Sequence, residues 1–235
     1  MTPSSDFDRE PELERIRAQY ADYEQSGRYG LWDLRNPGFA RLVRERDARL
    51  MKLLRNSIGS QGPVLDLGAG SGRLAGVART SGVSREWVGV DIDESALAAA
   101  RVEFPWAQFV AASVDQLPIA DSSVGAVIAS VLFSSLPSRE FEAAVASEIG
   151  RVLRPDGWLI WYDLRYDNPS NPGVHGLGLR AIRRLFAGWD IQLSTTSLLP
   201  PLARRLGPAT PIAYPVLHAL PVLRSHLIGR MRPTP

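Results

Sequence analysis

The chain has 235 residues, of which 45% are hydrophobic and 22% are charged, enough for one α/β domain with a full core. It contains no cysteine, which excludes disulfides, thiolate metal sites and cysteine nucleophiles. The formal net charge of +2 is unevenly distributed, because residues 164–235 hold nine arginines and only two aspartates. Such a basic region suits an anionic substrate or a membrane surface, and we favour a solvated basic face as its simplest explanation.

The chain begins with polar residues and has no apolar segment of the kind found in secretory signals. No apolar run approaches the roughly 20 residues that span a bilayer, so we expect a cytoplasmic protein. Residues 13–25 have helical character. Residues 39–54 carry apolar side chains at helical spacing with charged residues between them, which predicts an amphipathic helix packed on a sheet.

From residue 63 onward, strand and helix patterns alternate with short links. This alternation implies parallel crossover connections and a three-layer α/β sandwich. The segment 124–130 is nearly all apolar, as expected for a strand buried on both faces. The expected strands cover residues 63–67, 87–92, 108–112, 124–130, 158–162, 190–198 and 223–231, and the expected helices cover residues 73–80, 94–103, 139–153, 180–186 and, broken by prolines, 200–220.

The first core strand carries a carboxylate near its end and is followed by three glycines, Gly68, Gly70 and Gly72. A glycine loop between a strand and a helix lets backbone N–H groups approach a ligand at the helix N-terminus. A dinucleotide fingerprint would need its third glycine, or an alanine, at the position of Arg73. Asp91 ends the next predicted strand, and the loop and this carboxylate together favour a nucleoside cofactor over a simple turn and a helix cap.

These residues resemble motif I of the class I S-adenosylmethionine-dependent methyltransferases, and the likeness covers residues 60–165. The resemblance implies a Rossmann-like, seven-stranded, mostly parallel sheet of order 3-2-1-4-5-7-6 with an antiparallel seventh strand. It also implies that Asp91 binds the ribose hydroxyls of S-adenosylmethionine, with Ile92 packed on the adenine, and that the product is S-adenosylhomocysteine. The other expected cofactor-binding residues are Asp66, Gly68, Ala69, Gly70 and Gly72 in the loop, Ser113, Val114 and Asp115 near the adenine amine, and Ser130 beside the methyl group.

One of these positions departs from the family. Ser113 stands where the family often has an aspartate, and Asp115 lies close enough in sequence to serve instead. A polar loop residue without a ligand is the competing interpretation of Ser113.

The loop that follows the fourth strand excludes several methyltransferase subclasses. It lacks the Asn/Asp-Pro-Pro-aromatic run of enzymes that methylate amino groups of nucleic acids, and it lacks the paired glutamates of the protein-arginine enzymes. Methyl transfer depends mainly on alignment of the nucleophile, and a hydroxyl acceptor also benefits from a base. Asp163 and His175, which follow the fifth strand, are the candidate bases, although His175 also fits a plain surface loop residue. His218 and His226 lie among apolar residues and are expected to be packed, and no ligand cluster suggests a metal site.

Segments 161–172, 200–207 and 223–229 resemble a narrower group, the small bacterial methyltransferases of polysaccharide and natural-product gene clusters. This resemblance implies O-methylation of a hydroxyl on a small molecule, such as a sugar or a glycosylated or anionic metabolite. It implies a helical lid in residues 1–58 and a cofactor-binding core in residues 59–235 with an insert at 200–222. Three roles stay open for the insert, namely a cap on the acceptor pocket, which we favour, contact with a membrane surface, and pairing in a homodimer.

Three other functions stay open from the sequence. Arg73 argues against an NAD(P)-dependent oxidoreductase. The basic C-terminal third is compatible with an RNA or other nucleic-acid methyltransferase, although no aromatic-basic module accompanies it. A non-catalytic protein that binds S-adenosylmethionine would account for the weak candidates for a base.

Overall fold

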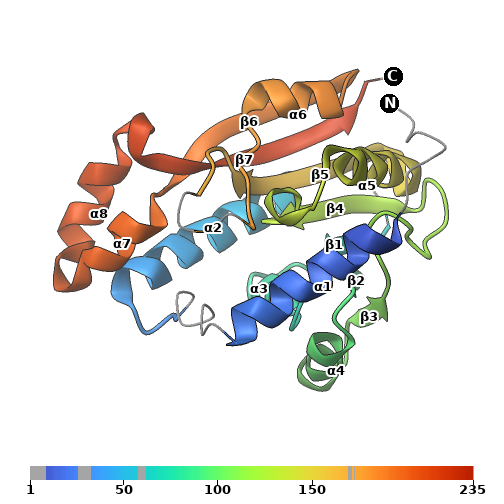
Figure 1. The fold of residues 1–235 in the computed structure, drawn as a ribbon, viewed down its shortest axis with the longest axis horizontal. Helices are drawn as coiled ribbons and strands as arrows, with labels where there is room; N and C mark the ends of the chain where they lie inside the picture. The colour runs from blue at the N-terminus through green and yellow to red at the C-terminus, as the bar shows by residue number, and fades with distance from the viewer. Residues whose placement is uncertain (1–8, 26–32, 58–61, 169–170, 172, 235) are drawn as a thin grey trace.

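The fold comes from a computed structural model that describes residues 9–25, 33–57, 62–168, 171 and 173–234 (Figure 1). The expected domain boundary between residues 58 and 59 lies outside the described residues. The helices are α1 (Glu10–Gln25), α2 (Pro37–Asn56), α3 (Arg73–Thr80), α4 (Glu94–Glu103), α5 (Arg139–Val152), α6 (Leu179–Leu185), α7 (Pro200–Arg205) and α8 (Thr210–His218), with short 3₁₀ turns η2 (Phe133–Ser135), η3 (Gly207–Ala209) and η4 (Pro221–Leu223). The strands are β1 (Val64–Leu67), β2 (Trp87–Asp91), β3 (Gln108–Ala111), β4 (Val124–Ser130), β5 (Leu153–Leu164), β6 (Trp189–Leu198) and β7 (Arg224–Pro233).

The strands form one sheet in the order β3-β2-β1-β4-β5-β7-β6. Neighbours from β3 to β5 pair in parallel, whereas β7 pairs antiparallel with both β5 and β6. Parallel neighbours need crossover connections, and α3, α4 and α5 run between the parallel strands. The predicted strand order and the antiparallel seventh strand are therefore confirmed. The order reverses between β1 and β4, and a ligand crevice is expected at the carboxyl ends of strands flanking such a point.

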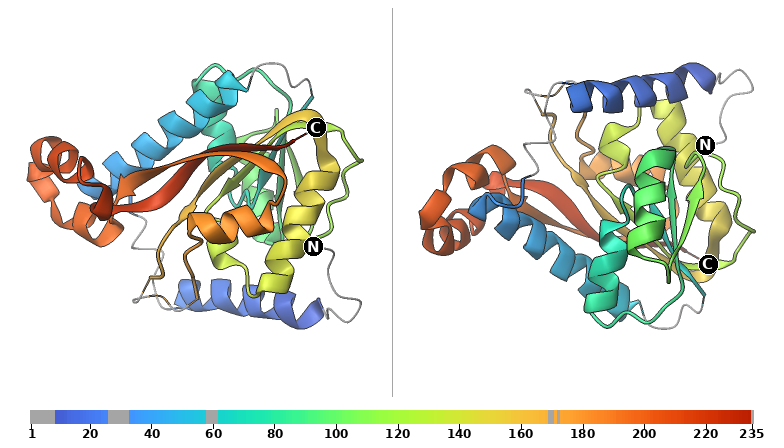
Figure 2. Two further views of the ribbon diagram at one scale, coloured as in Figure 1. Left: turned by 90° about the horizontal axis from the view of Figure 1, so that it is seen from above. Right: turned by 90° about the horizontal axis from the view of Figure 1, so that it is seen from below.

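Helices cover both faces of the sheet (Figure 2). One hydrophobic cluster joins α1, α5 and α6 to the sheet through residues such as Leu13, Phe141 and Ile182. A second cluster joins α2, α3 and α4 to the opposite face through residues such as Leu50 and Leu97. The side chains of β4 alternate between these two clusters, which explains why its sequence is apolar at nearly every position.

Helix α2 connects the sheet to the C-terminal segment. Its N-terminus is capped by the side chain of Asn36, which accepts a hydrogen bond from the Phe39 N–H at 3.0 Å, and Pro37 occupies the first turn. The C-terminal half of α2 packs on the sheet. Its N-terminal half forms a third cluster with α7, α8 and the end of β6, in which Phe39 and Leu42 meet Ala203 and Tyr214.

Two segments differ from the sequence expectation. Residues 154–157, which separate the expected helix 139–153 from the expected strand 158–162, lie inside the long strand β5, because β4 pairs with Leu153 and then again from Trp158 across an irregularity. The helical stretch expected over residues 200–220 is divided into α7 and α8 by the turn at Gly207, whose φ of +47° ends the first helix. Prolines at positions 208 and 211 then begin new turns instead of continuing the old helix.

Candidate functional site

The loop between β1 and α3 adopts a conformation that needs glycine. Gly68, Gly70 and Gly72 have φ values of +71°, +51° and +75°, in the left-handed region that other residues rarely occupy. A Cβ added at Gly72 would meet the rings of Phe104 and Phe109 at 2.9 and 2.8 Å, so this glycine is required by packing. A Cβ at Gly70 would meet nothing within 4 Å. The loop therefore borders open space at Gly70, where a ligand can approach the backbone.

Asp91 lies beside this loop at the end of β2. One carboxylate oxygen, Oδ2, accepts a hydrogen bond from the Gly70 N–H at 2.8 Å, and Oδ1 accepts one from the Asp93 N–H at 3.0 Å. Because each carboxylate oxygen has two lone pairs, both can accept a further hydrogen bond from a ligand. Ile92, next in the chain, is half-buried. The structure thus brings the predicted loop and the predicted ribose-binding carboxylate into direct contact.

Asp66 is buried in β1, at 2% relative exposure, and its Oδ2 has no hydrogen-bond partner among the described residues. Burial raises the pKa of Asp66 to about 7, the nearby charge of Asp91 raises it further, and the cation of Arg46 opposes both effects. A buried carboxyl oxygen without a partner is uncommon, and it marks a place where a bound molecule can supply a hydrogen bond.

A charged network that the sequence patterns did not predict ties α2 to the glycine loop. Asp47, on the buried face of α2, accepts hydrogen bonds from the Nε of Arg46 at 3.0 Å and from the Nη1 and Nη2 of Arg73, the Nη1 contact measuring 3.1 Å. Burial lowers the pKa of Arg73, and the neighbouring Arg46 lowers it further. The signal that could have revealed this network is a charged residue within the apolar stripe of an amphipathic helix.

Arg46 also faces the carboxyl ends of the central strands. Its guanidinium carbon lies 5.8 Å from the centre of the Tyr162 ring on β5. Its positive charge acts on the pKa values of Asp66, Tyr162 and His226, which come from three different strands. A cation in this position is suited to the carboxylate of an amino-acid-like ligand.

The residues expected near the adenine amine lie after β3. The side chain of Val114 is buried in the hydrophobic core and leaves only its backbone for a ligand. Asp115 is also buried, accepts a hydrogen bond from the Nε of Arg9 at 2.6 Å, and is contacted by the hydroxyl of Ser113. Arg9 therefore holds the start of α1 against this loop, and no sequence pattern pointed to that contact.

The loop after β4 contains a strained residue next to Ser130. Val131 has a φ of +57°, which is a genuine outlier for a β-branched residue, and its N–H donates to the Tyr162 carbonyl at 2.7 Å. Ser130 is half-buried at the end of β4. Strained backbone of this kind concentrates at functional sites, and this one stands at the carboxyl end of the central strand.

The two candidate bases meet the same short turn, η2. Asp163 is fully buried, accepts hydrogen bonds from the Ser134 N–H at 3.2 Å and the Leu164 N–H at 2.7 Å, and has its pKa raised to about 6 by burial against the effect of these bonds. The backbone N–H of His175 donates to the Ser134 carbonyl at 2.9 Å. The side-chain Nε2 of His175 lies 2.7 Å from Oε1 of Glu142 on α5.

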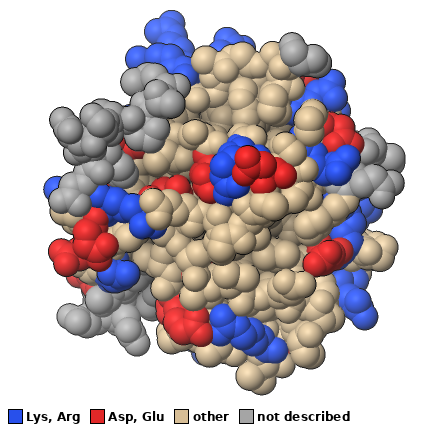
Figure 3. All heavy atoms as spheres, turned by 90° about the vertical axis from the view of Figure 1, so that its right-hand side faces the viewer, with Lys and Arg blue, Asp and Glu red and all other residues tan. Residues whose placement is uncertain are grey.

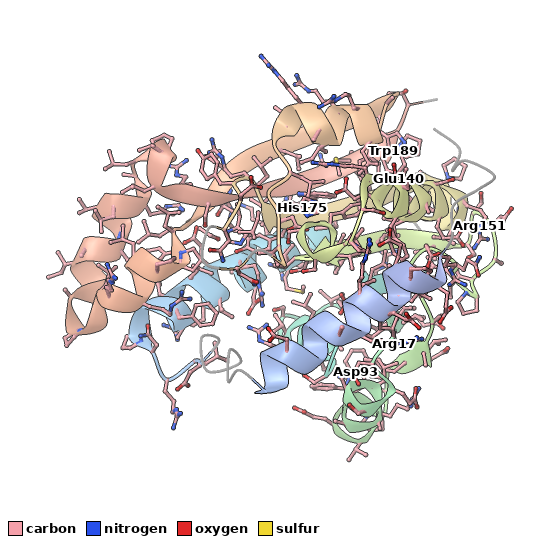
Figure 4. The ribbon with its side chains drawn as sticks, in the orientation of Figure 1. Arg17, Asp93, Glu140, Arg151, His175 and Trp189 are labelled. Atoms are coloured by element: carbon pink, nitrogen blue, oxygen red, sulfur yellow. The ribbon has the colours of Figure 1, made fainter. Side chains whose placement is uncertain are left out.

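Figure 4 shows His175 well apart from Asp93, which follows Asp91 closely in the chain. His175 thus stands away from the predicted ribose position. Its catalytic role, like that of Asp163, stays a prediction.

A second polar cluster lies between α2, β5, β6 and β7. The hydroxyl of Tyr162 is 3.0 Å from that of Ser197, and the Tyr162 ring stacks on His226 with centroids 4.5 Å apart. Burial lowers the pKa of His226 to about 3, so this imidazole is neutral. Glu45 of α2 accepts a hydrogen bond from the Tyr214 hydroxyl at 2.9 Å and lies 3.1 Å from Nε2 of His218.

Within the residues that the structure describes, no group of histidine, aspartate and glutamate side chains could hold a metal ion. Over the same residues, no helix is both long and apolar enough to cross a membrane.

Comparisons with known proteins agree with this geometry. Residues 65–161 match the methyltransferase domain family. The chain is 33% identical over 116 residues to a probable S-adenosylmethionine-dependent methyltransferase of Mycobacterium tuberculosis, covering 46% of this chain and 40% of that protein. It is 33% identical over 125 residues to a malonyl-[acyl-carrier protein] O-methyltransferase of Methylococcus capsulatus, covering 52% and 44%. The chain therefore spans less than half the length of these relatives.

A solved structure gives the same result for the fold. An S-adenosylmethionine-dependent methyltransferase of Methanosarcina mazei superimposes with a TM-score of 0.58 at 16% sequence identity, over 77% of this chain and 97% of that one. The architecture is thus the Rossmann-like methyltransferase fold that the sequence predicts.

Proposed function

Because residues 65–161 match the methyltransferase domain family, we propose that this chain uses S-adenosylmethionine to methylate an oxygen atom of a small molecule, with a hydroxyl as the first candidate acceptor. The observation that carries the proposal is the contact between the glycine loop and Asp91. A backbone N–H at Gly70 and a carboxylate from the neighbouring strand meet at the edge of open space.

The residues present fit the cofactor. The open side of Gly70 leaves room for close approach, and the unpartnered Oδ2 of Asp66 provides a buried polar atom at the same edge. S-adenosylmethionine, when bound, supplies a methyl group on a positively charged sulfur that is a good leaving group. The protein's task is then to hold this nucleoside and to align the acceptor.

Four side chains are proposed to hold the cofactor. Asp91 accepts hydrogen bonds from the ribose hydroxyls, and Ile92 packs on the adenine. Arg46 binds the carboxylate of the methionine portion, because its cation faces the carboxyl ends of the central strands. Ser113 lies at the adenine edge, where the backbone of Val114 is also available.

The acceptor side of the crevice is proposed to lie around Ser130 and η2. Asp163 and His175 both contact Ser134 in this turn, which supports a role for them near the acceptor. A carboxyl whose pKa is raised to about 6 can take up a proton at neutral pH more readily than an ordinary aspartate. The sugar-containing acceptors of the gene-cluster enzymes that the sequence resembles stay part of this proposal.

A carboxylate is the second candidate acceptor. It is already deprotonated at neutral pH and needs no base, which agrees with the burial of Asp163 and the engagement of His175 by Glu142. The nine arginines in residues 164–235 are compatible with an anionic substrate. The name of the Methylococcus relative, an O-methyltransferase that acts on a malonyl group, is consistent with this chemistry.

The proposal is tested in two steps. Isothermal titration compares S-adenosylmethionine with NAD, and binding of NAD alone would overturn it. Formation of S-adenosylhomocysteine is then followed with panels of hydroxylated and carboxylated small molecules and with RNA. Turnover with RNA alone, or cofactor binding without turnover on any panel, would favour a nucleic-acid enzyme or a non-catalytic binding protein.

The pH profile of Asp163→Asn and His175→Ala separates the two acceptor classes. With a hydroxyl acceptor, loss of the Asp163 base lowers kcat above its pKa of about 6, where the carboxylate is deprotonated, and so changes the shape of the profile. With a carboxylate acceptor, the shape stays that of the unsubstituted protein.

A further inference from the structure

The segment from Gly207 to Leu223, which contains α8 and η4, has an unusual surface. Its ten exposed residues are all apolar, namely Pro208, Ala209, Pro211, Ile212, Pro215, Val216, Ala219, Leu220, Pro221 and Val222. The largest of them, Ile212, Val216, Leu220 and Val222, have 80%, 65%, 50% and 70% of their surface exposed. We call these four side chains the α8 face. It lies at the end of the molecule where α7 and α8 project beyond the helices that cover the sheet (Figure 1).

The α8 face is held in place from behind. Ile212 and Val216 are four residues apart and so share one side of α8. Tyr214 is buried and donates a hydrogen bond from its hydroxyl to Glu45 at 2.9 Å, which anchors the helix to α2. Thr210, also buried, caps the preceding turn through the Gly207 carbonyl at 2.7 Å. These contacts fix the orientation of the segment, so that its apolar side chains stay exposed on the opposite side.

An exposed apolar residue elsewhere on the molecule has a different setting. Val102 on α4 is 84% exposed but stands alone between Arg101 and Glu103, both of which are exposed and charged. Single exposed apolar residues of this kind are normal on a soluble protein, whereas a contiguous group marks an interaction surface. The far end of the molecule, drawn in Figure 3, mixes basic and acidic side chains across its face.

Within the C-terminal part of the chain, the charges near the α8 face are of one sign, and Glu45 of α2 is engaged by Tyr214 on the packed side of α8. Residues 191–235 contain five arginines and no aspartate or glutamate. Arg205 is exposed at the end of α7, and Arg224 follows η4, where its Nε donates to the His218 carbonyl at 2.8 Å. Arg41 on α2 is exposed too and lies 5.9 Å from the centre of the Tyr214 ring. Basic side chains thus border an apolar surface that has no acidic residue to balance them within its own segment.

We infer that the α8 face rests on the surface of an anionic lipid bilayer. Apolar side chains on one side of a short helical segment, bordered by arginines, match the pattern of an interfacial membrane contact. Ile212, Val216, Leu220 and Val222 enter the boundary between headgroups and acyl chains, and the arginines stay at the level of the phosphates. A second copy of the chain fits this surface less well, because a symmetric pair would bring arginines of the same sign together.

The contact is tested by co-sedimentation of the full chain with vesicles. Vesicles of phosphatidylglycerol and phosphatidylcholine are compared with vesicles of phosphatidylcholine alone. We expect binding to the anionic vesicles, weakening as salt is added, and little binding to the neutral ones. Failure of the protein to bind anionic vesicles at low salt overturns the inference.

Three variants locate the contact. Ile212→Asp/Val216→Asp is expected to weaken binding by roughly tenfold or more, since it replaces two inserted apolar groups with charges of the wrong sign. Arg205→Glu is expected to weaken binding and to reduce its salt dependence. Val102→Asp is the control, because it places an aspartate at an even more exposed valine outside the α8 face and should leave binding unchanged.

Folding and oligomeric state decide between the alternatives. Circular dichroism and cofactor binding of the double variant must match the unsubstituted protein, and Ile212→Ser/Val216→Ser provides a milder substitution if they do not. Equal binding of the double variant and the Val102→Asp control would overturn the inference. A dimer in solution that becomes monomeric only in the double variant would do the same, because the face would then be covered by a second copy.

Discussion

Replacement of Asp91 by alanine tests the nucleoside site most directly. In the structure the Asp91 carboxylate accepts the N–H of Gly70 at 2.8 Å and the N–H of Asp93 at 3.0 Å, so it already joins the glycine loop to the end of β2. Hydrogen bonds from ribose hydroxyls to this charged group are worth about 1.5–3 kcal/mol. Their loss should raise the Kd for S-adenosylmethionine by about 10- to 150-fold.

Asp93→Ala is the matched control. Asp93 lies two residues further on, and its Oδ1 accepts the N–H groups of Ser95 and Ala96 at 2.9 and 3.2 Å as the N-cap of α4. Its loss should lower the free energy of unfolding by about 1 kcal/mol and leave the Kd unchanged. Asp91→Asn retains one acceptor oxygen, and we expect a Kd between those of Asp91→Ala and the unsubstituted protein.

The assay is isothermal titration with S-adenosylmethionine. Because the charge of Asp91 raises the pKa of Asp66, the titration is run about two pH units above the pKa of Asp66, so that this group is ionised in every variant. An unchanged Kd in Asp91→Ala would refute the assignment of the ribose site. Equal weakening by Asp91→Ala and Asp93→Ala would show that binding depends on the local fold and not on the carboxylate itself.

Three further predictions follow from the same site. Gly70→Val should abolish cofactor binding, because the valine side chain would fill the open space at the loop. Gly82→Val is the control: Gly82 has a φ of +74° and equally free surroundings, so this variant should reproduce the backbone strain and retain binding. Similar binding by both variants would contradict the prediction. Because the pKa of Asp66 is raised from 3.8 to about 7, the native state holds a proton that the unfolded chain releases, so the stability contributed by this group is present at low pH and lost as pH rises between these values. Urea unfolding of Asp66→Asn should therefore show a relative gain across this window, up to roughly 4 kcal/mol, and a gain that does not vary with pH would refute the buried proton. Arg46→Ala should raise the Kd for S-adenosylmethionine more than the Kd for adenosine, because adenosine lacks the carboxylate, and an equal rise for both ligands would remove Arg46 from the carboxylate site.

The sequence determined those features that depend on local patterns. The nearly continuous apolar run of β4 reports burial on both faces, and the alternation of strands and helices reports parallel crossovers. The loop of Gly68, Gly70 and Gly72 could be recognised from the sequence, because only glycine adopts its positive φ values without strain. The position of Asp91 beside the glycine loop could be predicted, because the carboxyl ends of neighbouring parallel strands lie side by side.

The tertiary structure alone decided which distant residues meet. In the sequence Asp47 resembles any charged helix residue, and only the packing of α2 against the sheet brings it to Arg73. Arg9 likewise lies in a polar N-terminal segment, and only the position of α1 brings it to Asp115. His175 follows β5 in the chain, yet its side chain pairs with Glu142 on α5. The apolar α8 face is likewise indistinguishable in sequence from a buried helix, since burial depends on what packs over a residue, and no periodicity within one segment contains that information.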